Sequence, residues 1–148
     1  MLKKALVSFA IVFIVVVFAF SFVEGARPGI CPIQADTKIV IYGDTGTGGV
    51  GTPSKSWMTH FFSWWKTQDA NVKYVFVDRN DIKTDCVLGN YPNIKLYVQP
   101  GGNAYYQQNA LGSAGRNNIL NYLDNHNGAY LGTCAGFFNA AGDYFWQG

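Results

Sequence analysis

The feature that most constrains the fold is a corner of five residues, Gly132-Thr133-Cys134-Ala135-Gly136, between two apolar segments. Residues 129–131 have the composition of a short buried strand, and residues 137–141 that of a helix. A strand, a Gly-x-Cys-x-Gly turn and a helix in this order form the thiol version of the nucleophile elbow. The sequence therefore predicts that Cys134 is displayed on the corner between a strand and a helix.

The residues around Cys134 suit a nucleophile. The backbone of such a corner is strained, and side chains at positions 132 and 136 would collide, so both positions favour glycine. The N-terminal end of the following helix favours the thiolate, which is the reactive form of cysteine. The backbone N–H of Ala135 is then expected to face a developing oxyanion. The alternative is a small buried cysteine in an ordinary glycine-rich turn.

Four apolar runs predict strands, and helical patterns separate them. The runs are residues 38–42, 72–77, 94–98 and 129–131. Strands that alternate with helices predict an α/β fold with a parallel sheet covered on both faces. Ligands of such sheets bind at the carboxyl ends of the strands. The loops after Tyr42, Val98 and Leu131 therefore share the sheet edge that holds Cys134.

Two of the intervening segments have helical spacing. The first has an apolar face that includes Phe62, and either Ser54 or Ser56 is its expected N-cap. The second is marked by residues 119–123 and ends near Asn127. Residues 78–92 are polar, and we expect irregular structure there.

Two glycine-rich loops lie at the predicted site edge. Gly101 and Gly102 follow the third strand, and their amides are candidates for a second oxyanion donor. An ordinary turn is the alternative for this pair. Residues 43–51 are also rich in glycine but lack the lysine of a phosphate-binding loop. We expect a flexible loop there, with Asp44 as a candidate to face the pocket.

The sequence offers no clear base for the thiol, although a cysteine nucleophile normally needs a histidine within hydrogen-bond reach. Its two histidines are His60 and His126. His126 precedes the strand that Cys134 follows, so we expect it at the opposite sheet edge, roughly 20 Å or more away. His60 lies in the first predicted helix, where a packing or surface role is expected.

The N-terminus has the pattern of a targeting segment. Lys3 and Lys4 precede residues 5–23, which carry no charge. Such a segment is a secretory signal peptide or a membrane anchor. We expect residues 1–25 to be cleaved as a signal peptide, with retention as an anchor the alternative. In both cases the lysines stay cytoplasmic and the protein lies outside the cytoplasm. Residues 26–37 are the expected linker, and residues 38–148 the domain.

The net charge and the cysteine content limit the classes of ligand that we expect this protein to bind. The net charge is +2, or +1 without residues 1–25, and no basic stripe suggests nucleic acid. No spacing of His, Cys and Asp predicts a metal site, so we expect neither a metal nor a cofactor. After export, Cys31 and Cys86 could form a disulfide; two unpaired thiols are the alternative.

Residues 96–103, the helix after them and residues 128–138 together resemble the biotin-protein ligase N-terminal domain family, which is similar to class I glutamine amidotransferases. The opening Ile39-Val40-Ile41-Tyr42-Gly43-Asp44 also fits this family. The resemblance covers roughly residues 38–146 and implies a flavodoxin-like three-layer sandwich. It places the family's nucleophile on Cys134 and its oxyanion segment on Gly101 and Gly102. Biotin ligation is not implied, because that chemistry belongs to a separate domain.

The resemblance also has a departure. In amidotransferase-type triads the histidine and its acidic partner follow the elbow on later strands, whereas this sequence ends at Gly148. We therefore expect a C-terminally truncated domain, with a degenerate domain as the alternative. Three functions compete: thiol-dependent transfer or hydrolysis of a small-molecule or peptide amide, a non-catalytic binding or scaffold domain, and a structural protein tethered through residues 5–23.

Overall fold

The computed structural model describes residues 33–84, 87–89 and 92–141. The leader, Cys31, Cys86 and residues 142–148 lie outside the described residues, as does the predicted disulfide. Within the described ranges no helix is long and apolar enough to cross a membrane. Residues 33–37, the end of the expected linker, pack onto the folded unit, because Ile33 and Thr37 are both buried.

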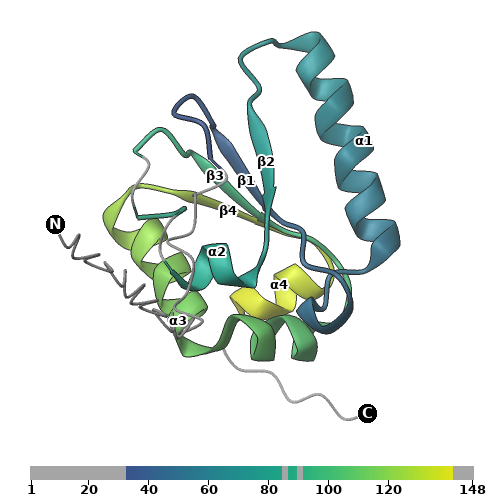
Figure 1. The fold of residues 1–148 in the computed structure, drawn as a ribbon, viewed down its shortest axis with the longest axis vertical. Helices are drawn as coiled ribbons and strands as arrows, with labels where there is room; N and C mark the ends of the chain where they lie inside the picture. Colours follow the sequence, from purple (N-terminus) through teal and green to yellow (C-terminus); the bar gives the residue numbers. More distant parts are fainter. Residues whose placement is uncertain (1–32, 85–86, 90–91, 142–148) are drawn as a thin grey trace, which may run out of the picture.

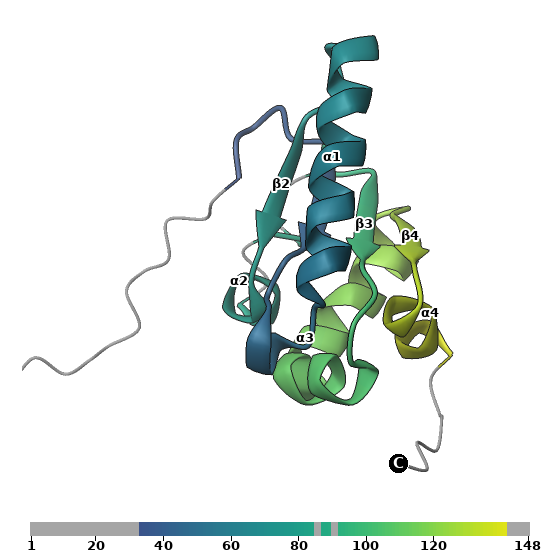
Figure 2. The ribbon, with the colours of Figure 1, turned by 90° about the vertical axis from the view of Figure 1, so that its right-hand side faces the viewer.

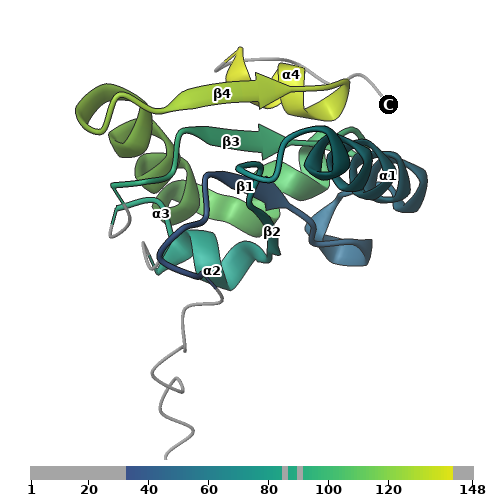
Figure 3. The same cartoon turned by 90° about the horizontal axis from the view of Figure 1, so that it is seen from above.

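The sheet has four parallel strands, as the alternating pattern predicts (Figure 1). They are β1 (Ile39–Tyr42), β2 (Tyr74–Val77), β3 (Leu96–Gln99) and β4 (Ala129–Gly132). Their order is β2-β1-β3-β4, and Figure 3 shows them side by side in this order. This all-parallel sheet with helices on its faces confirms the α/β, flavodoxin-like fold.

Helix α1 (Thr52–Gln68) covers one face of the sheet (Figure 2). Its Phe62 is fully buried in a cluster with residues of β1, β2 and β3. The N-cap of α1 is Gly51, and Pro53 lies in the first turn. The expectation that Ser54 or Ser56 caps this helix is therefore wrong, because the helix starts earlier than the apolar spacing indicates.

The opposite face is covered by α2 (Arg79–Lys83) and α3 (Ala104–Asn125). Helix α2 corrects the expectation of irregular structure in residues 78–92. It is stabilised by a capping box, in which the Asp78 side chain accepts from backbone N–H groups of the first turn and Asp81 accepts from the Asp78 N–H. Helix α3 is capped by the Asn103 side chain and kinks at Gly112, where φ is 57°.

Strand β4 forms one edge of the sheet. Its residues alternate between exposed and half-buried, whereas every residue of β1 is buried. The register pairs Leu131 with Val98, so Leu131 lies on the face that α1 covers elsewhere, yet 41% of it is exposed. Helix α1 covers the other strands and leaves β4 to one side (Figure 2). The part of the sheet that holds the elbow is thus the least covered.

Candidate active site at the carboxyl edge of the sheet

Cys134 has the backbone geometry of a nucleophile elbow. It follows β4 and precedes α4 (Ala135–Ala140), and its φ and ψ are 50° and −111°. A cysteine with positive φ occupies a sparsely populated conformation that persists only when surrounding contacts hold it. Among the described non-glycine residues, only Asn127 shares a positive φ. The side chain of Cys134 is exposed, so the strained corner presents a free thiol to solvent.

Each of the two glycines of the corner is required by a different close contact. A Cβ atom on Gly132 would lie 2.7 Å from the backbone carbon of Gly136. A Cβ atom on Gly136 would overlap the backbone carbonyl oxygen of Gln99 in β3. The turn is further held by a hydrogen bond from the Thr133 N–H to the Gln99 carbonyl oxygen, 3.1 Å long. The tight corner therefore depends on the absence of side chains at both positions.

Gly101 lies directly beside the thiol. A Cβ atom at Gly101 would be 3.6 Å from Cys134 Sγ and 2.9 Å from Ser54 Oγ. Ser54 belongs to the first turn of α1, and its hydroxyl makes no hydrogen bond with the described residues. The structure thus brings Cys134, Gly101 and Ser54 to one place. Sequence reasoning assigned Ser54 only to capping, because its approach to Cys134 depends on how α1 packs against β3.

Ala135 and Gly102 complete the set of predicted site residues. Ala135 is the first residue of α4, and its backbone N–H makes no hydrogen bond within the described ranges. Gly102 is exposed, with a φ of 150° that favours glycine, and a side chain there would overlap the Gly49 carbonyl oxygen. The Ala135 amide therefore has no partner among the described residues, and only 2% of Ala135 is exposed.

The glycine-rich loop of residues 43–51 is not the flexible loop expected from its composition. It contains a 3-10 turn, η1 (Gly46–Gly48), whose last carbonyl accepts a hydrogen bond of 2.9 Å from the buried Tyr42 hydroxyl. Two backbone hydrogen bonds join the loop to the segment beside the thiol: the Gly51 N–H donates to Gly101, and the Asn103 N–H donates to Gly49. These bonds therefore hold the loop against the Pro-Gly-Gly segment, residues Pro100 to Gly102.

Asp44 does not offer a free carboxylate to the site. Its two oxygens accept hydrogen bonds from the Arg79 guanidinium, one of them 3.2 Å long. The same guanidinium donates to the Thr47 hydroxyl. These bonds from Arg79 hold the pKa of the Asp44 carboxyl below its usual value. Asp44 therefore joins the glycine-rich loop to the start of α2, which is a structural role.

Replacement of Asp44 by asparagine is expected to destabilise the protein by about 2 kcal/mol at pH 7, since it removes charge-assisted hydrogen bonds from a partly buried pair. Because the folded-state pKa is lowered, this stabilisation is present above the unfolded pKa of about 3.9 and is lost as the pH falls through the folded pKa. Urea unfolding between pH 7 and pH 3 measures both effects. The exposed Asp124→Asn is the matched control, and equal losses in the two variants would contradict this role.

A network of buried amides lies under the elbow. Gln99 and Gln107 are almost completely buried, and Gln99 Nε2 donates to Gln107 Oε1 over 3.0 Å. Gln107 Nε2 donates to the Pro100 carbonyl, and Asn139 of α4 donates to Gln107 Oε1. The Tyr130 hydroxyl donates to the Gly136 carbonyl over 2.6 Å and lies 3.1 Å from Gln99 Oε1. This network connects α3, α4 and the end of β3, and it fixes the corner on which Cys134 sits.

The described residues do not supply a base at the thiol. No hydrogen bond joins Cys134 Sγ to any of them. His126 caps the C-terminal end of α3 and precedes β4, so it lies at the sheet edge opposite Cys134, as predicted. His60 is an exposed residue of α1. In the described part of the chain, no group of three or more His, Cys, Asp or Glu side chains could hold a metal.

The fold and the corner together define an α/β protein with a nucleophile elbow that carries a thiol. No family model matches the chain, and no curated protein or solved structure was found to be similar to it. The class of the site therefore rests on the geometry around Cys134.

Proposed function

We propose that this chain carries an exported, amidotransferase-like domain in which Cys134 attacks an amide carbonyl. The observation that supports this most strongly is the backbone of Cys134, which is held at a φ of 50° with its thiol exposed. A strained conformation that the surrounding contacts maintain is typical of functional positions. The relation to the biotin-protein ligase N-terminal domain family is part of this proposal and rests on the motifs around Gly101 and Cys134.

The chemistry begins when the Cys134 thiolate adds to the carbonyl carbon of a small-molecule or peptide amide. The Ala135 N–H would donate to the oxyanion, with the amide of Gly101 or Gly102 as a second donor. Collapse of the tetrahedral intermediate breaks the C–N bond, and the amine leaves with a proton. Water or an acceptor amine then cleaves the thioester and restores the thiol. The thiol proton requires a base from outside the described residues.

The proposed location is extracytoplasmic. Residues 5–23 are an uncharged segment after Lys3 and Lys4, which is the pattern of a signal peptide or an anchor. Sequencing of the mature N-terminus tests this part of the proposal. A soluble protein that begins at Ala26 would support cleavage and exclude the anchor.

Acyl transfer to Cys134 is the direct test of the proposed chemistry. Full-length protein incubated with p-nitrophenyl acetate at neutral pH is expected to release nitrophenol in one fast stoichiometric phase, with the acetyl group on Cys134 in peptide mass spectra. Cys134→Ala should abolish the fast phase and leave only slow labelling of lysines. Labelling spread over lysines in the parent protein, with no preference for Cys134, would contradict the proposal.

The alternative function is a non-catalytic binding or scaffold domain of the same fold. It is favoured by one observation, the absence of any described hydrogen-bonding partner for the thiol. It predicts that a ligand stabilises the protein without turnover and that Cys134→Ser retains cellular function. Loss of cellular function in a Cys134→Ser protein that folds normally would exclude it.

A further inference from the structure

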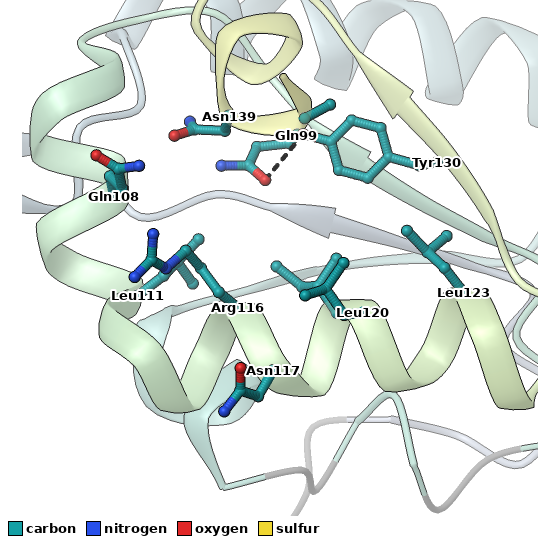
Figure 4. Close-up of a pocket in the computed structure, with 11 residues that line it drawn as sticks. Gln99, Gln108, Leu111, Arg116, Asn117, Leu120, Leu123, Tyr130 and Asn139 are labelled. Carbon is teal, nitrogen blue, oxygen red and sulfur yellow. Dashed lines mark hydrogen bonds between the residues drawn. The ribbon is translucent and has the colours of Figure 1, made fainter. Parts of the chain in front are cut away.

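A cavity lies on the α3 side of the sheet, between α3, α4 and β4 (Figure 4). Its volume is about 330 Å³, which is within the range of small-molecule sites. None of residues 132–136 lines it, so it is distinct from the exposed thiol of Cys134. The cavity is partly open to solvent.

The two ends of this cavity differ in chemistry. Arg116 and Gln108 of α3 and Asn139 of α4 gather at one end, where the Arg116 guanidinium points toward the two amides (Figure 4). Leu120 and Leu123 of α3 line the other end, opposite the ring of Tyr130. Leu120 is 55% exposed, so it has apolar surface that a bound molecule would cover.

The charge on the described lining of the cavity is entirely positive. Among the described residues that line it, Arg116 is the only charged side chain and none is acidic. The Arg116 Nε donates to the Gly112 carbonyl over 3.3 Å, and no ion pair engages this guanidinium within the described ranges. An unpaired guanidinium beside two amide side chains suits a carboxylate, which accepts several hydrogen bonds at once.

We propose that this cavity binds a carboxylate with a linear apolar body, such as a medium-chain fatty acid. The carboxylate accepts hydrogen bonds from Arg116 and the neighbouring amides, and the hydrocarbon chain covers Leu120, Leu123 and the Tyr130 ring. Charge complementarity at one end and apolar surface at the other select this class over a neutral or cationic amphiphile. The occupant contacts Tyr130 and Gln99, which also hydrogen-bond within the network under the elbow.

Isothermal titration calorimetry of the full-length protein, as purified from its expression host, tests this proposal. The three probes share one alkyl chain and differ in the head group: octanoate, octanamide and octylammonium. We expect saturable binding of octanoate, about tenfold weaker binding of octanamide, and no binding of octylammonium, since only octanoate makes charge-assisted hydrogen bonds with Arg116. Equal affinity for all three probes would overturn the proposal.

Two variants test the polar end and the apolar end of the cavity separately. Arg116→Gln is expected to weaken octanoate binding about tenfold and to remove the preference over octanamide. Leu120→Asn should weaken octanoate and octanamide alike. Lys66→Gln, which removes an exposed cation from α1, is the matched control and should bind octanoate as the parent does. Retention of the preference for octanoate in Arg116→Gln would overturn the carboxylate assignment.

The same titration distinguishes another occupant. If a further polypeptide segment fills the cavity, octanoate will not bind and Leu120→Asn will lower the melting temperature of the protein, because Leu120 would then be a core residue. That combination of results would overturn the proposal. Because the site does not include Cys134, its failure would leave the proposed acyl chemistry unaffected.

Discussion

Replacement of Gly136 by alanine is expected to destabilise the protein by about 3 kcal/mol or more, the upper range for overpacking a rigid site. The added methyl group would overlap the carbonyl oxygen of Gln99, a backbone atom of an interior strand. Neither side can move easily, because the Gln99 carbonyl also accepts the hydrogen bond from Thr133 and the Gly136 carbonyl accepts one from Tyr130. Equilibrium unfolding in urea, followed by tryptophan fluorescence, measures the loss.

Gly51→Ala is the matched control for this prediction. Gly51 has a φ of −68°, which any residue adopts, and a Cβ atom there would lie 3.5 Å from the Cα atom of Gly102, an ordinary van der Waals contact. Its replacement therefore costs only the N-cap preference of α1, about 1 kcal/mol or less. If Gly136→Ala were no less stable than Gly51→Ala, the close approach of the elbow to β3 would be contradicted.

Replacement of Gln107 by leucine is expected to destabilise the protein by about 3 kcal/mol or more, because it leaves several buried polar groups without partners. Leucine has a similar volume but cannot accept from Gln99 and Asn139 or donate to the Pro100 carbonyl. Since this network holds α4 and the Pro-Gly-Gly segment in place, we also expect slower acylation of Cys134. Urea unfolding and the nitrophenol burst measure the two effects.

Asn109→Leu, an amide-to-leucine change at an exposed position of the same helix, controls for the loss of an amide from α3. It should change stability by less than about 0.5 kcal/mol, as surface substitutions usually do. A Gln107→Leu protein as stable as Asn109→Leu would show that the buried amides do not organise the corner.

The main architecture could be predicted because each strand is a separate apolar run. The runs that contain Ile41, Phe76, Val98 and Leu131 all became parallel strands, and the Gly-x-Cys-x-Gly turn became the expected corner. The local sequence pattern was sufficient to predict these strands, because a strand buried on both faces of a parallel sheet needs a continuous apolar sequence. The position of His126 at the far edge follows from the same order of elements.

Features that depend on long-range packing were missed. Gln107 donates to Pro100, but its burial follows from the docking of α3 and α4 and leaves no pattern in the sequence. Ser54 comes close to Gly101, beside the thiol, only through the placement of α1 on β3. The short helix α2 did have a local signal, Asp78 three residues before Asp81, which was outweighed by the polar composition around it. The prediction of a flexible loop at residues 43–51, which rested on composition, was also wrong, because hydrogen bonds to distant backbone groups order this loop.

The central claim is that the corner at Cys134 displays a reactive thiol, and the rate of its alkylation by iodoacetamide at pH 7, compared with that of free cysteine, tests this most directly. The account predicts that Cys134 in the folded protein is alkylated about tenfold faster than free cysteine, or more. Peptide mass spectra of the full-length protein would assign the label to Cys134, with Cys134→Ala as the blank. A rate no faster than that of free cysteine, or of Cys134 in the urea-unfolded protein, would contradict the account.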